Sequence, residues 1–255
     1  MDPFATPRPR LGPLDALTTL EHFALITYDV DPERLASLLP AGYGFEPEIA
    51  TLSNGQRRAF VSAVNFRDVH FRFAAAPFVK VTCEQTNYRA YVRRNGERAV
   101  WFFGTTLASR TVMLPRLVWG MPWHRVSATL NATWDGNRCV AYESRSVGKW
   151  ANGLMRLEGS AEPVDILDGW STPAEAALVL THPLIGYFAH NRGSGVGRYE
   201  VWHAPLKLTV GRAIEAHFSA FEERGLVQPG QEPHSVLLQQ STEFVVLLPP
   251  TRVPR

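Results

Sequence analysis

Most of the chain consists of short segments rich in β-branched and aromatic residues, separated by turn-forming residues. Asn-Gly or Asp-Gly pairs at residues 54–55, 95–96 and 135–136 join such segments into hairpins, because these residues adopt the positive φ of two-residue turns. The strands that this pattern predicts are residues 21–30, 48–52, 58–66, 78–92, 98–106, 125–134, 138–146, 198–210 and 235–248. Hairpins at this spacing, without a parallel crossover pattern, indicate an antiparallel barrel or sandwich.

Short helices are expected between some of these strands. Asp31 is a helix N-cap with Pro32 at the first helical position. Ser109 caps a segment that runs toward Trp119, in which Pro115 implies a kink or a late start. Residues 172–175 have the form of a capping box for a helix that ends near residue 182.

Three further segments are less regular. Residues 149–170 predict another hairpin, turning around Gly153, and residues 212–224 predict a short amphipathic helix. Residues 1–19 contain four prolines and no clear period, which predicts a surface arm that either packs on a neighbouring subunit or is disordered. The expected organisation is therefore an arm at residues 1–19 and a single domain at residues 20–255.

Composition narrows the class of protein. A chain of 255 residues with 45% hydrophobic residues can bury a substantial core. Its formal net charge of +2 gives no reason to expect nucleic acid or an anionic membrane as partner. Cys83 and Cys139 match neither a disulfide framework nor a zinc site, so buried thiols and no metal are expected. No signal-like or membrane-length apolar run is present, which favours a cytoplasmic protein.

Residues 116–126 form an elbow between a predicted helix and a predicted strand. Gly120 can end the helix in a left-handed conformation, and Pro122 prevents its continuation. Trp123 and His124 follow directly. On composition alone this is a tight turn with a tryptophan packed into the core; it is also a rigid place to mount catalytic groups.

Four segments together resemble a known family. Residues 23–40 are similar to the opening strand and helix of the acetoacetate decarboxylase-like superfamily, and residues 116–126 to its elbow. Residues 87–92 (Asn-Tyr-Arg-Ala-Tyr-Val) and residues 201–208 resemble motifs of its DUF2071 branch. The resemblance spans residues 23–208 and implies an antiparallel, cone-shaped β-barrel with short flanking helices around one small-molecule pocket.

The departures from the decarboxylases concern chemistry. Trp123 and His124 stand where those enzymes have paired lysines, one of which forms a Schiff base. Gln85 stands where they have an acidic residue, with Glu84 one step away, and Glu21 stands near the place of their arginine. Because a Schiff base needs a primary amine, the sequence predicts chemistry without an imine and without a cofactor.

Alternation along residues 83–91 places Gln85, Asn87, Arg89 and Tyr91 on one face of a strand. That face either meets water or lines a pocket, and the resemblance favours the pocket. A buried Arg89 needs an anionic partner, so we predict that it anchors a carboxylate or an enolate oxygen. Glu84 remains a catalytic candidate because it lies beside the family's acidic position.

His124 is the leading general acid–base candidate, because imidazole titrates near neutral pH; the alternative is a histidine fixed by a backbone carbonyl. Trp123 would form an apolar wall. Arg116 is either an anion contact or a helix-surface charge, and His203 either a ligand contact or a solvated strand residue. Glu21 could pair with Arg89 or His124. The predicted substrate-binding residues are Gln85, Asn87, Tyr91, Arg116, Trp123, His203 and Glu21.

These residues predict an enzyme that acts on a small carbonyl or carboxylate metabolite by proton transfer, in a lyase, dehydratase or cyclase step. Its catalytic residues would be His124, Arg89 and Glu84. The alternative is a non-catalytic barrel that binds a small molecule. Neither hypothesis involves nucleic acid or a membrane, and both leave a homo-oligomer open.

Overall fold

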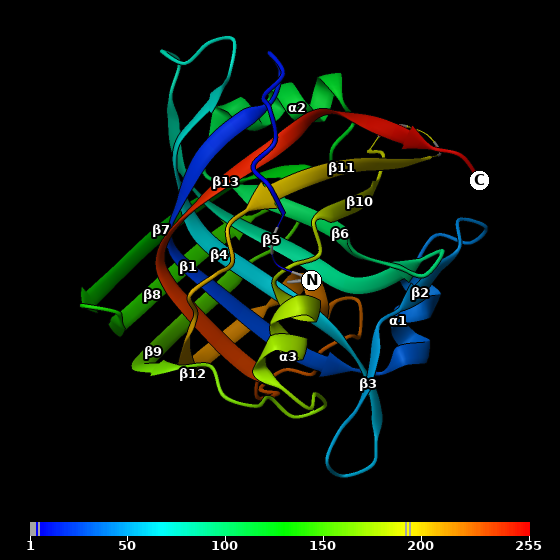
Figure 1. Cartoon of the computed structure of the whole chain (residues 1–255), viewed down its shortest axis with the longest axis vertical. Helices are drawn as coiled ribbons and strands as arrows, with labels where there is room; N and C mark the ends of the chain where they lie inside the picture. Colours follow the sequence, from blue (N-terminus) through cyan, green and yellow to red (C-terminus); the bar gives the residue numbers. More distant parts are fainter. Residues whose placement is uncertain (1–3, 5, 192, 194) are drawn as a thin grey trace.

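The computed structural model describes residues 4, 6–191, 193 and 195–255. Over these residues the chain forms one 13-stranded sheet with short helices around it (Figure 1). The strands are β1 (Ala16–Val30), β2 (Phe45–Pro47), β3 (Ile49–Thr51), β4 (Arg57–Phe73), β5 (Val81–Arg94), β6 (Glu97–Leu107), β7 (Trp123–Asp135), β8 (Arg138–Gly148), β9 (Gly153–Pro163), β10 (Ile185–Ala189), β11 (Val196–His203), β12 (Thr209–Phe218) and β13 (Ser235–Val253). The helices are α1 (Pro32–Leu38), α2 (Met113–Val118), α3 (Pro173–Leu180) and α4 (Ser219–Glu222), with the 3-10 turn η1 (Arg110–Val112) before α2. The predicted class, mainly β with short flanking helices, is confirmed.

The sheet closes on itself twice. The pairing of β5 with β6 closes a ring in the order β6-β7-β8-β9-β12-β13-β1-β4-β5. A second path runs from β6 through β10 and β11 to β13, whose first part pairs with β12 and whose last part pairs with β11. Strand β13 and four strands that follow it in the sheet belong to both rings, and we call these four, β1, β4, β5 and β6, the shared wall.

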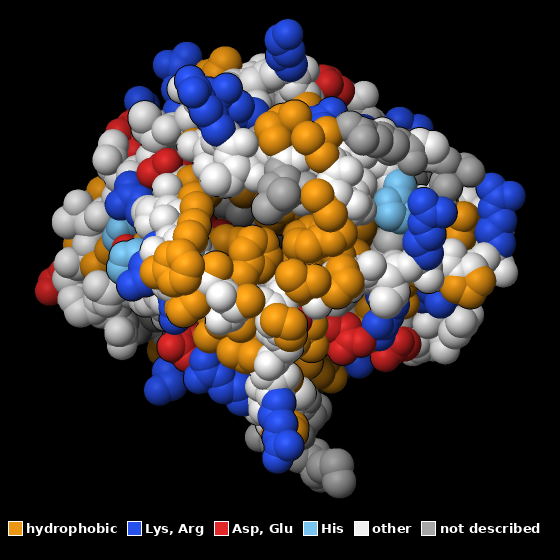
Figure 2. All heavy atoms as spheres, turned by 90° about the horizontal axis from the view of Figure 1, so that it is seen from above, with side chains coloured by type: hydrophobic (Ala, Val, Ile, Leu, Met, Phe, Trp, Pro, Cys, Tyr) orange, Lys and Arg blue, Asp and Glu red, His pale blue; other side chains and the backbone are white. Residues whose placement is uncertain are grey.

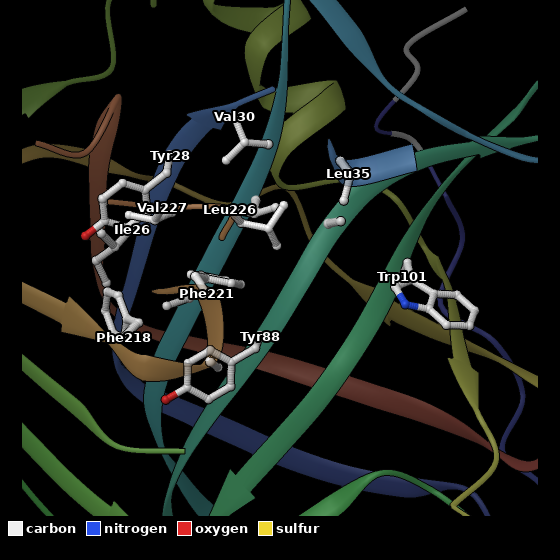
Figure 3. Packing of buried hydrophobic residues seen from close by; sticks show 14 of the residues in the cluster. Ile26, Tyr28, Val30, Leu35, Tyr88, Trp101, Phe218, Phe221, Leu226 and Val227 are labelled. Carbon is white, nitrogen blue, oxygen red and sulfur yellow. The ribbon is translucent and has the colours of Figure 1, made fainter. Parts of the chain in front are cut away.

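The shared wall is buried on both faces. Alternate residues of β4 belong to two apolar clusters: Ala59, Val61 and Ala63 to the first, and Phe60, Val64 and Phe66 to the second. Because neighbouring strand residues point to opposite faces, the two clusters are separate cores on the two sides of the wall. Figure 3 shows the first core, where Tyr88 of the wall meets Phe218 and Phe221 from the far side of the ring.

Local turn and capping chemistry sets the element boundaries largely as predicted. The glycine of each predicted hairpin turn has positive φ, and the flanking strands pair around it. The side chain of Asp31 accepts hydrogen bonds from the first backbone N–H groups of α1. Ser109 caps η1, and Pro115 lies in α2. The α-helix therefore starts late, as predicted, after a 3-10 turn.

Three predicted elements were wrong. Residues 149–170 contain the single strand β9, which pairs with β8 on one side and β12 on the other. Residues 212–224 continue β12 and end in the one-turn helix α4. The backbone N–H and C=O groups of this strand bond to β9, so they are not available for a helix. The strand predicted at residues 198–210 is interrupted after His203, since Pro205 lacks the N–H donor that a continued strand needs.

The sheet is also not purely antiparallel. β6 pairs in parallel with β10 through Val100–Phe102 and with β7 through Thr105–Leu107. The connection from β6 to β7 passes through η1 and α2, and a helical crossover of this kind is what a parallel pair requires. The sequence pattern predicted this helical segment but did not reveal that the strands on either side of it pair in parallel.

The N-terminal arm is shorter than predicted. β1 begins at Ala16, so residues 16–19 belong to the sheet, while residues 1–3 and 5 of the predicted arm lie outside the described residues. The described part packs on the chain's own domain: the carbonyl of Thr6 accepts a hydrogen bond from Trp202 Nε1 at 2.8 Å, and the carbonyl of Asp15 accepts one from the backbone N–H of Ala74 at 2.8 Å. In the part of the chain that the structure describes, no helix is both long and apolar enough to cross a bilayer.

The shared wall gives a test of the fold at Gly104. A Cβ at this position of β6 would lie 2.6 Å from the ring of Trp150. We expect Gly104→Ala to lower the unfolding free energy by about 1–3 kcal/mol through overpacking, measured by urea unfolding. In a Trp150→Leu background the same substitution should have a smaller effect; an equal effect in both backgrounds would contradict the packing.

Candidate functional site

A cavity of about 100 Å³ lies between the shared wall and strands β10, β11 and β13. Its polar lining consists of Thr18, Asp68, Gln85, Asn87, Arg89 and Thr105. Its largest apolar side chains are Phe66, Phe71, Phe102, Trp123, Tyr199 and Phe244. A water molecule occupies about 30 Å³ in the liquid, so the cavity has room for a ligand group of only a few heavy atoms.

Strand β5 supplies the polar floor of this cavity. Gln85, Asn87 and Arg89 line the cavity, as expected for alternate residues of a strand that faces inward. Tyr91 lies on the same face and is buried beyond the cavity lining, where its hydroxyl is 2.7 Å from Ser62 Oγ and donates to the carbonyl of Leu180 at 3.0 Å. Of the two orientations considered for this face, the structure has the inward one.

The amide of Asn87 is held in one orientation. Its Oδ1 atom accepts hydrogen bonds from Gln85 Nε2 at 2.9 Å and from Thr105 Oγ1 at 3.0 Å. Both lone pairs of that oxygen are therefore used. Among the described residues, none accepts a hydrogen bond from Asn87 Nδ2. The two N–H donors of Asn87 are thus free for an oxygen atom of a molecule in the cavity.

Arg89 keeps an uncompensated positive charge. Its Nη2 atom donates to the carbonyl of Leu180 at 2.9 Å and to the hydroxyl of Tyr91 at 3.4 Å, while its Nε atom is buried without a partner. Leu180 is the last residue of α3, where backbone carbonyls carry partial negative charge. No ion pair of Arg89 with a carboxylate occurs among the residues that the structure describes. Arg89 therefore holds α3 in place and remains able to attract an anion.

Asp68 is a cavity residue that the sequence analysis missed. Its side chain is buried, at 6% exposure, and Thr18 Oγ1 donates a hydrogen bond to its Oδ1 atom. Burial raises the pKa of this carboxyl to about 7, against the smaller, opposite effect of the Thr18 hydrogen bond. A carboxyl group with such a pKa can both take and return a proton near neutral pH.

The sequence did contain a signal for Asp68. Residues 60, 62, 64, 66 and 68 share one phase of β4, and the first four are Phe, Ser, Val and Phe. An acidic residue that continues this buried phase has to be paired or neutral. Arg67 and Asp68 side by side resemble an ordinary exposed charge pair, which concealed the signal.

The elbow carries Trp123 into the cavity wall. Gly120 has a φ of 65°, and a Cβ at that position would lie 2.5 Å from His190 Nδ1, so glycine is required there. The backbone N–H of Thr105 donates to the carbonyl of Pro122 at 2.9 Å, which joins the elbow to β6. Trp123 then lies opposite Thr105 in the parallel pair and lines the cavity.

His124 points away from the cavity, which corrects its predicted partnership with Arg89. As the next residue of β7 it faces the opposite side of the strand, where its ring stacks on Trp150 with centroids 4.4 Å apart. Arg116 Nη1 lies 3.3 Å from His124 Nδ1 and donates to the carbonyl of Trp123 at 3.0 Å. Burial, then Arg116 and Arg224, lower the pKa of His124 to about 4. Arg116 supports the elbow and does not line the cavity.

Glu84 and Glu21 also lie outside the cavity lining. Glu84 is on the other face of β5, 3.3 Å from Arg67 Nε. Glu21 forms neither of its predicted pairs, with Arg89 or His124, among the described residues. A β-bulge causes this: His22 has a φ of 55° and the register of β1 shifts between Glu21 and Ala24. Leu20 therefore faces the cavity instead of Glu21.

His203 lies one layer behind the cavity. It is buried rather than solvated, its Nδ1 atom is 2.8 Å from the carbonyl of Ala204, and its ring stacks on Phe244 at 4.5 Å. Burial is the main cause of a pKa lowered to about 4, so this imidazole is neutral at pH 7. Phe244 separates it from a ligand in the cavity.

The cavity contains no primary amine. Lys80, Lys149 and Lys207 are all exposed, and none of them lines the cavity. Imine formation on a lysine therefore has no nucleophile here. Within the described ranges, no three or more His, Cys, Asp or Glu side chains are grouped so as to hold a metal ion.

Three larger hollows lie elsewhere on the described part of the chain. One of them, of about 650 Å³, lies by the start of β7 and includes Glu84, Arg110 and Arg125 in its lining. A second, of about 510 Å³, is mostly apolar and lies between α3 and the start of β12. The third, of about 820 Å³, is lined by β7, β8 and β9 and includes exposed ion pairs such as Arg156 with Glu143. None of the three combines unpaired hydrogen-bond donors with a buried titratable group, so the smaller cavity is the stronger candidate site.

The fold has counterparts among solved structures. An acetoacetate decarboxylase from Legionella pneumophila superposes with a TM-score of 0.62 at 12% identity, covering 98% of this chain and 93% of the other. The enduracididine biosynthesis enzyme MppR, complexed with pyruvate, gives 0.64 at 12% identity, with 96% and 92% covered. An acetoacetate decarboxylase-like enzyme from Sphingomonas wittichii gives 0.61 at 11% identity, with 99% and 98% covered. At these identities the likeness establishes the fold.

Sequence comparison identifies the branch. No curated protein sequence matches the chain. Residues 18–243 match the family DUF2071, described as an uncharacterized conserved protein, and this range includes all of the residues that line the cavity except Phe244 and Val246 of β13. The chain therefore belongs to the DUF2071 family, and its fold is that of the acetoacetate decarboxylase-like enzymes.

Proposed function

We propose that the cavity is the active site of an enzyme that transfers a proton on a small carbonyl or carboxylate metabolite without forming an imine. One observation carries this proposal: the fixed amide of Asn87 has two free N–H donors and lines the same cavity as the buried carboxyl of Asp68. Fixed donors of this kind stabilise an oxygen on which negative charge develops.

The reaction step follows from these groups. The carboxylate of Asp68 takes a proton from the carbon next to the substrate carbonyl, and the C–H electron pair moves into an enolate. The enolate oxygen accepts hydrogen bonds from Asn87 Nδ2, and the positive charge of Arg89 attracts a substrate carboxylate. Asp68 then returns the proton to carbon or to a leaving group, which is the step common to lyases, dehydratases and cyclases.

Asp68 replaces His124 in this scheme. The sequence favoured His124 because imidazole titrates near neutral pH, but its ring lies on the other face of β7. Burial raises the pKa of the Asp68 carboxyl from its low ordinary value into the same near-neutral range. The proposal keeps the reaction class that the sequence predicted and changes the residue that performs it.

The ligands of a structural relative support an oxo acid as substrate. MppR, on the same fold, is described in complex with pyruvate and with the condensation product of pyruvate and imidazole 4-carboxaldehyde. Pyruvate is a small carboxylate with an adjacent carbonyl, which is the chemistry that Arg89 and Asn87 suit in this chain. The amine-free cavity argues for a different activation of that carbonyl.

A non-catalytic binding protein is the second candidate. Trp123 and His124 in place of the superfamily's lysine pair favour it, and so does the contact of Arg89 with Leu180, which gives the guanidinium a structural role. The two functions differ in one property, because a binding protein holds an oxo acid without accelerating exchange of its protons.

Deuterium exchange tests the catalytic role of Asp68. The protein is incubated with 2-oxobutyrate or acetoacetate in D₂O, and loss of the C–H signal next to the carbonyl is followed by NMR. We expect exchange above the buffer rate in the wild type and a loss of about 10²- to 10⁴-fold in Asp68→Asn. His124→Gln serves as the control and should stay within about threefold of the wild type, because His124 does not line the cavity.

Three other outcomes would change the assignment. Loss of exchange in His124→Gln, with Asp68→Asn active, would return the acid–base role to His124. Binding of the acids by the wild type without exchange would establish the binding function. A covalent adduct trapped with borohydride on Lys80, Lys149 or Lys207 would overturn the exclusion of imine chemistry.

The pKa of Asp68 has a second consequence, for stability. Its folded-state pKa of about 7 lies above its ordinary value of 3.8, so the folded protein binds this proton more tightly than the unfolded chain does. The resulting stability is complete below about pH 4 and is lost as the pH rises through about 7. Between pH 5 and pH 8 we expect the wild type to lose about 2–3 kcal/mol of unfolding free energy relative to Asp68→Asn. Urea unfolding of both proteins at the two pH values measures this, and an identical pH dependence would contradict the raised pKa.

A further inference from the structure

A second hollow adjoins the cavity. It measures about 140 Å³ and shares Asp68, Phe71 and Trp123 with the cavity lining, so these three side chains stand at the junction between the two spaces. We call it the outer hollow. It lies between the β4–β5 connection and the start of α2, both of which are at the top of Figure 1. Figure 2, which views the molecule from this end, shows hydrophobic side chains gathered there.

The outer hollow is lined mainly by carbon. Its apolar lining consists of Phe73, Val79, Val81, Cys83, Leu107 and Pro115, together with the shared rings. Burial raises the pKa of Cys83 to about 12, so that residue is an uncharged thiol. The charged residues of the lining are Asp68 at the junction and Arg72, whose Nη1 atom donates to the carbonyl of His70 at 3.2 Å. A polar ligand group would leave hydrogen bonds unmade against this lining, whereas an alkyl or aryl group would not.

One face of β5 runs along both the cavity and the outer hollow. Arg89, Asn87 and Gln85 line the cavity, and Cys83 and Val81 line the outer hollow, all on the same face of β5. Alternate residues of a strand are about 6.6 Å apart. A positive charge, a pair of amide donors and an apolar chamber therefore follow one another along a single line. Asp68 pairs with Cys83 in the register, at the step between the amide donors and the apolar chamber.

We infer that the substrate is an oxo acid with an extended apolar chain, bound with its carboxylate toward Arg89, its carbonyl oxygen at Asn87 and its chain past Trp123 in the outer hollow. This inference rests on the proposed function, since it uses the same carbonyl and carboxylate contacts. It adds the substrate class: oxo acids with linear or aryl chains are preferred over pyruvate, which leaves the outer hollow unfilled.

The rim of the outer hollow provides a matched pair of variants. Val79 lines the hollow and is 56% exposed, so a larger side chain there can enter the space without disturbing a core. Phe78 is its neighbour on the same connection, is 82% exposed and does not line the hollow. Val79→Trp should therefore obstruct the outer hollow, and Phe78→Trp should leave it open.

The experiment measures affinity by calorimetry for pyruvate, 2-oxobutyrate, 2-oxohexanoate and 2-oxooctanoate. A buried methylene contributes about 0.8 kcal/mol, so we expect the affinity to rise about fourfold for each added CH₂ until the hollow is filled. Val79→Trp should weaken 2-oxooctanoate at least about tenfold and leave pyruvate unchanged, while Phe78→Trp changes neither. The methyl ester of 2-oxooctanoate should also bind at least about tenfold more weakly than the acid, because it lacks the charge that Arg89 attracts.

The outcomes separate this inference from the proposed function. Equal affinity for pyruvate and 2-oxooctanoate, with the ester still weakened, would overturn the apolar-chain specificity and leave the proton-transfer function intact. Equal weakening of both acids by Val79→Trp would likewise overturn it, since the variant would then have altered the common site. Failure of every acid to bind or to exchange protons would overturn the proposed function, and the inference with it.

Discussion

Burial of the shared wall on both faces is the constraint on which the rest of the structure depends. A polar side chain that is buried in the middle of β1, β4, β5 or β6 has little access to solvent, so it must find a partner inside the protein or stay neutral. Most of these groups do find one: Thr27, Ser62 and Tyr91 form a chain of hydrogen bonds that ends on the carbonyl of Leu180. Around the cavity this pairing is incomplete. There Asn87 retains two donors, Arg89 retains its charge and Asp68 retains a proton at a pH where an exposed aspartate would not.

The same constraint explains how the elbow separates two functions. Trp123 and His124 are consecutive strand residues, so only one of them can face a given core. The tryptophan faces the cavity, closes its wall with an indole and forms part of the junction with the outer hollow. The histidine faces the other side, between Trp150 and Arg116, where it is neutral and helps to hold the elbow. At the elbow of this chain, Trp123 thus provides shape and desolvation on the cavity side.

Local chemistry made much of the fold predictable. The hairpin turns, the Asp31 cap and the set of β5 residues that share one face follow from glycine conformations, capping oxygens and strand alternation, which act over a few residues. Alternation alone did not predict that this face points inward; the family resemblance did. The features that sequence reasoning missed depend on distant contacts. The bulge at His22, where the His22 carbonyl accepts a hydrogen bond from Tyr142 of β8, turns Glu21 out of the cavity lining. The parallel pairings of β6 and the depth at which Asp68 lies likewise depend on strands far away in the sequence.

Strand β13 has a consequence for how the molecule forms. It pairs with β1 along most of its length, with β12 at one end and with β11 at the other, so neither ring is complete until it is in place. Until then β1, β11 and β12 have unpaired backbone edges, which are templates for wrong pairing between chains. Contacts between elements more than 200 residues apart, such as Ala16 with Val246, also make closure a slow, late event. The pairing of β13 therefore determines both when the cavity forms and how long the folding chain is at risk of aggregation.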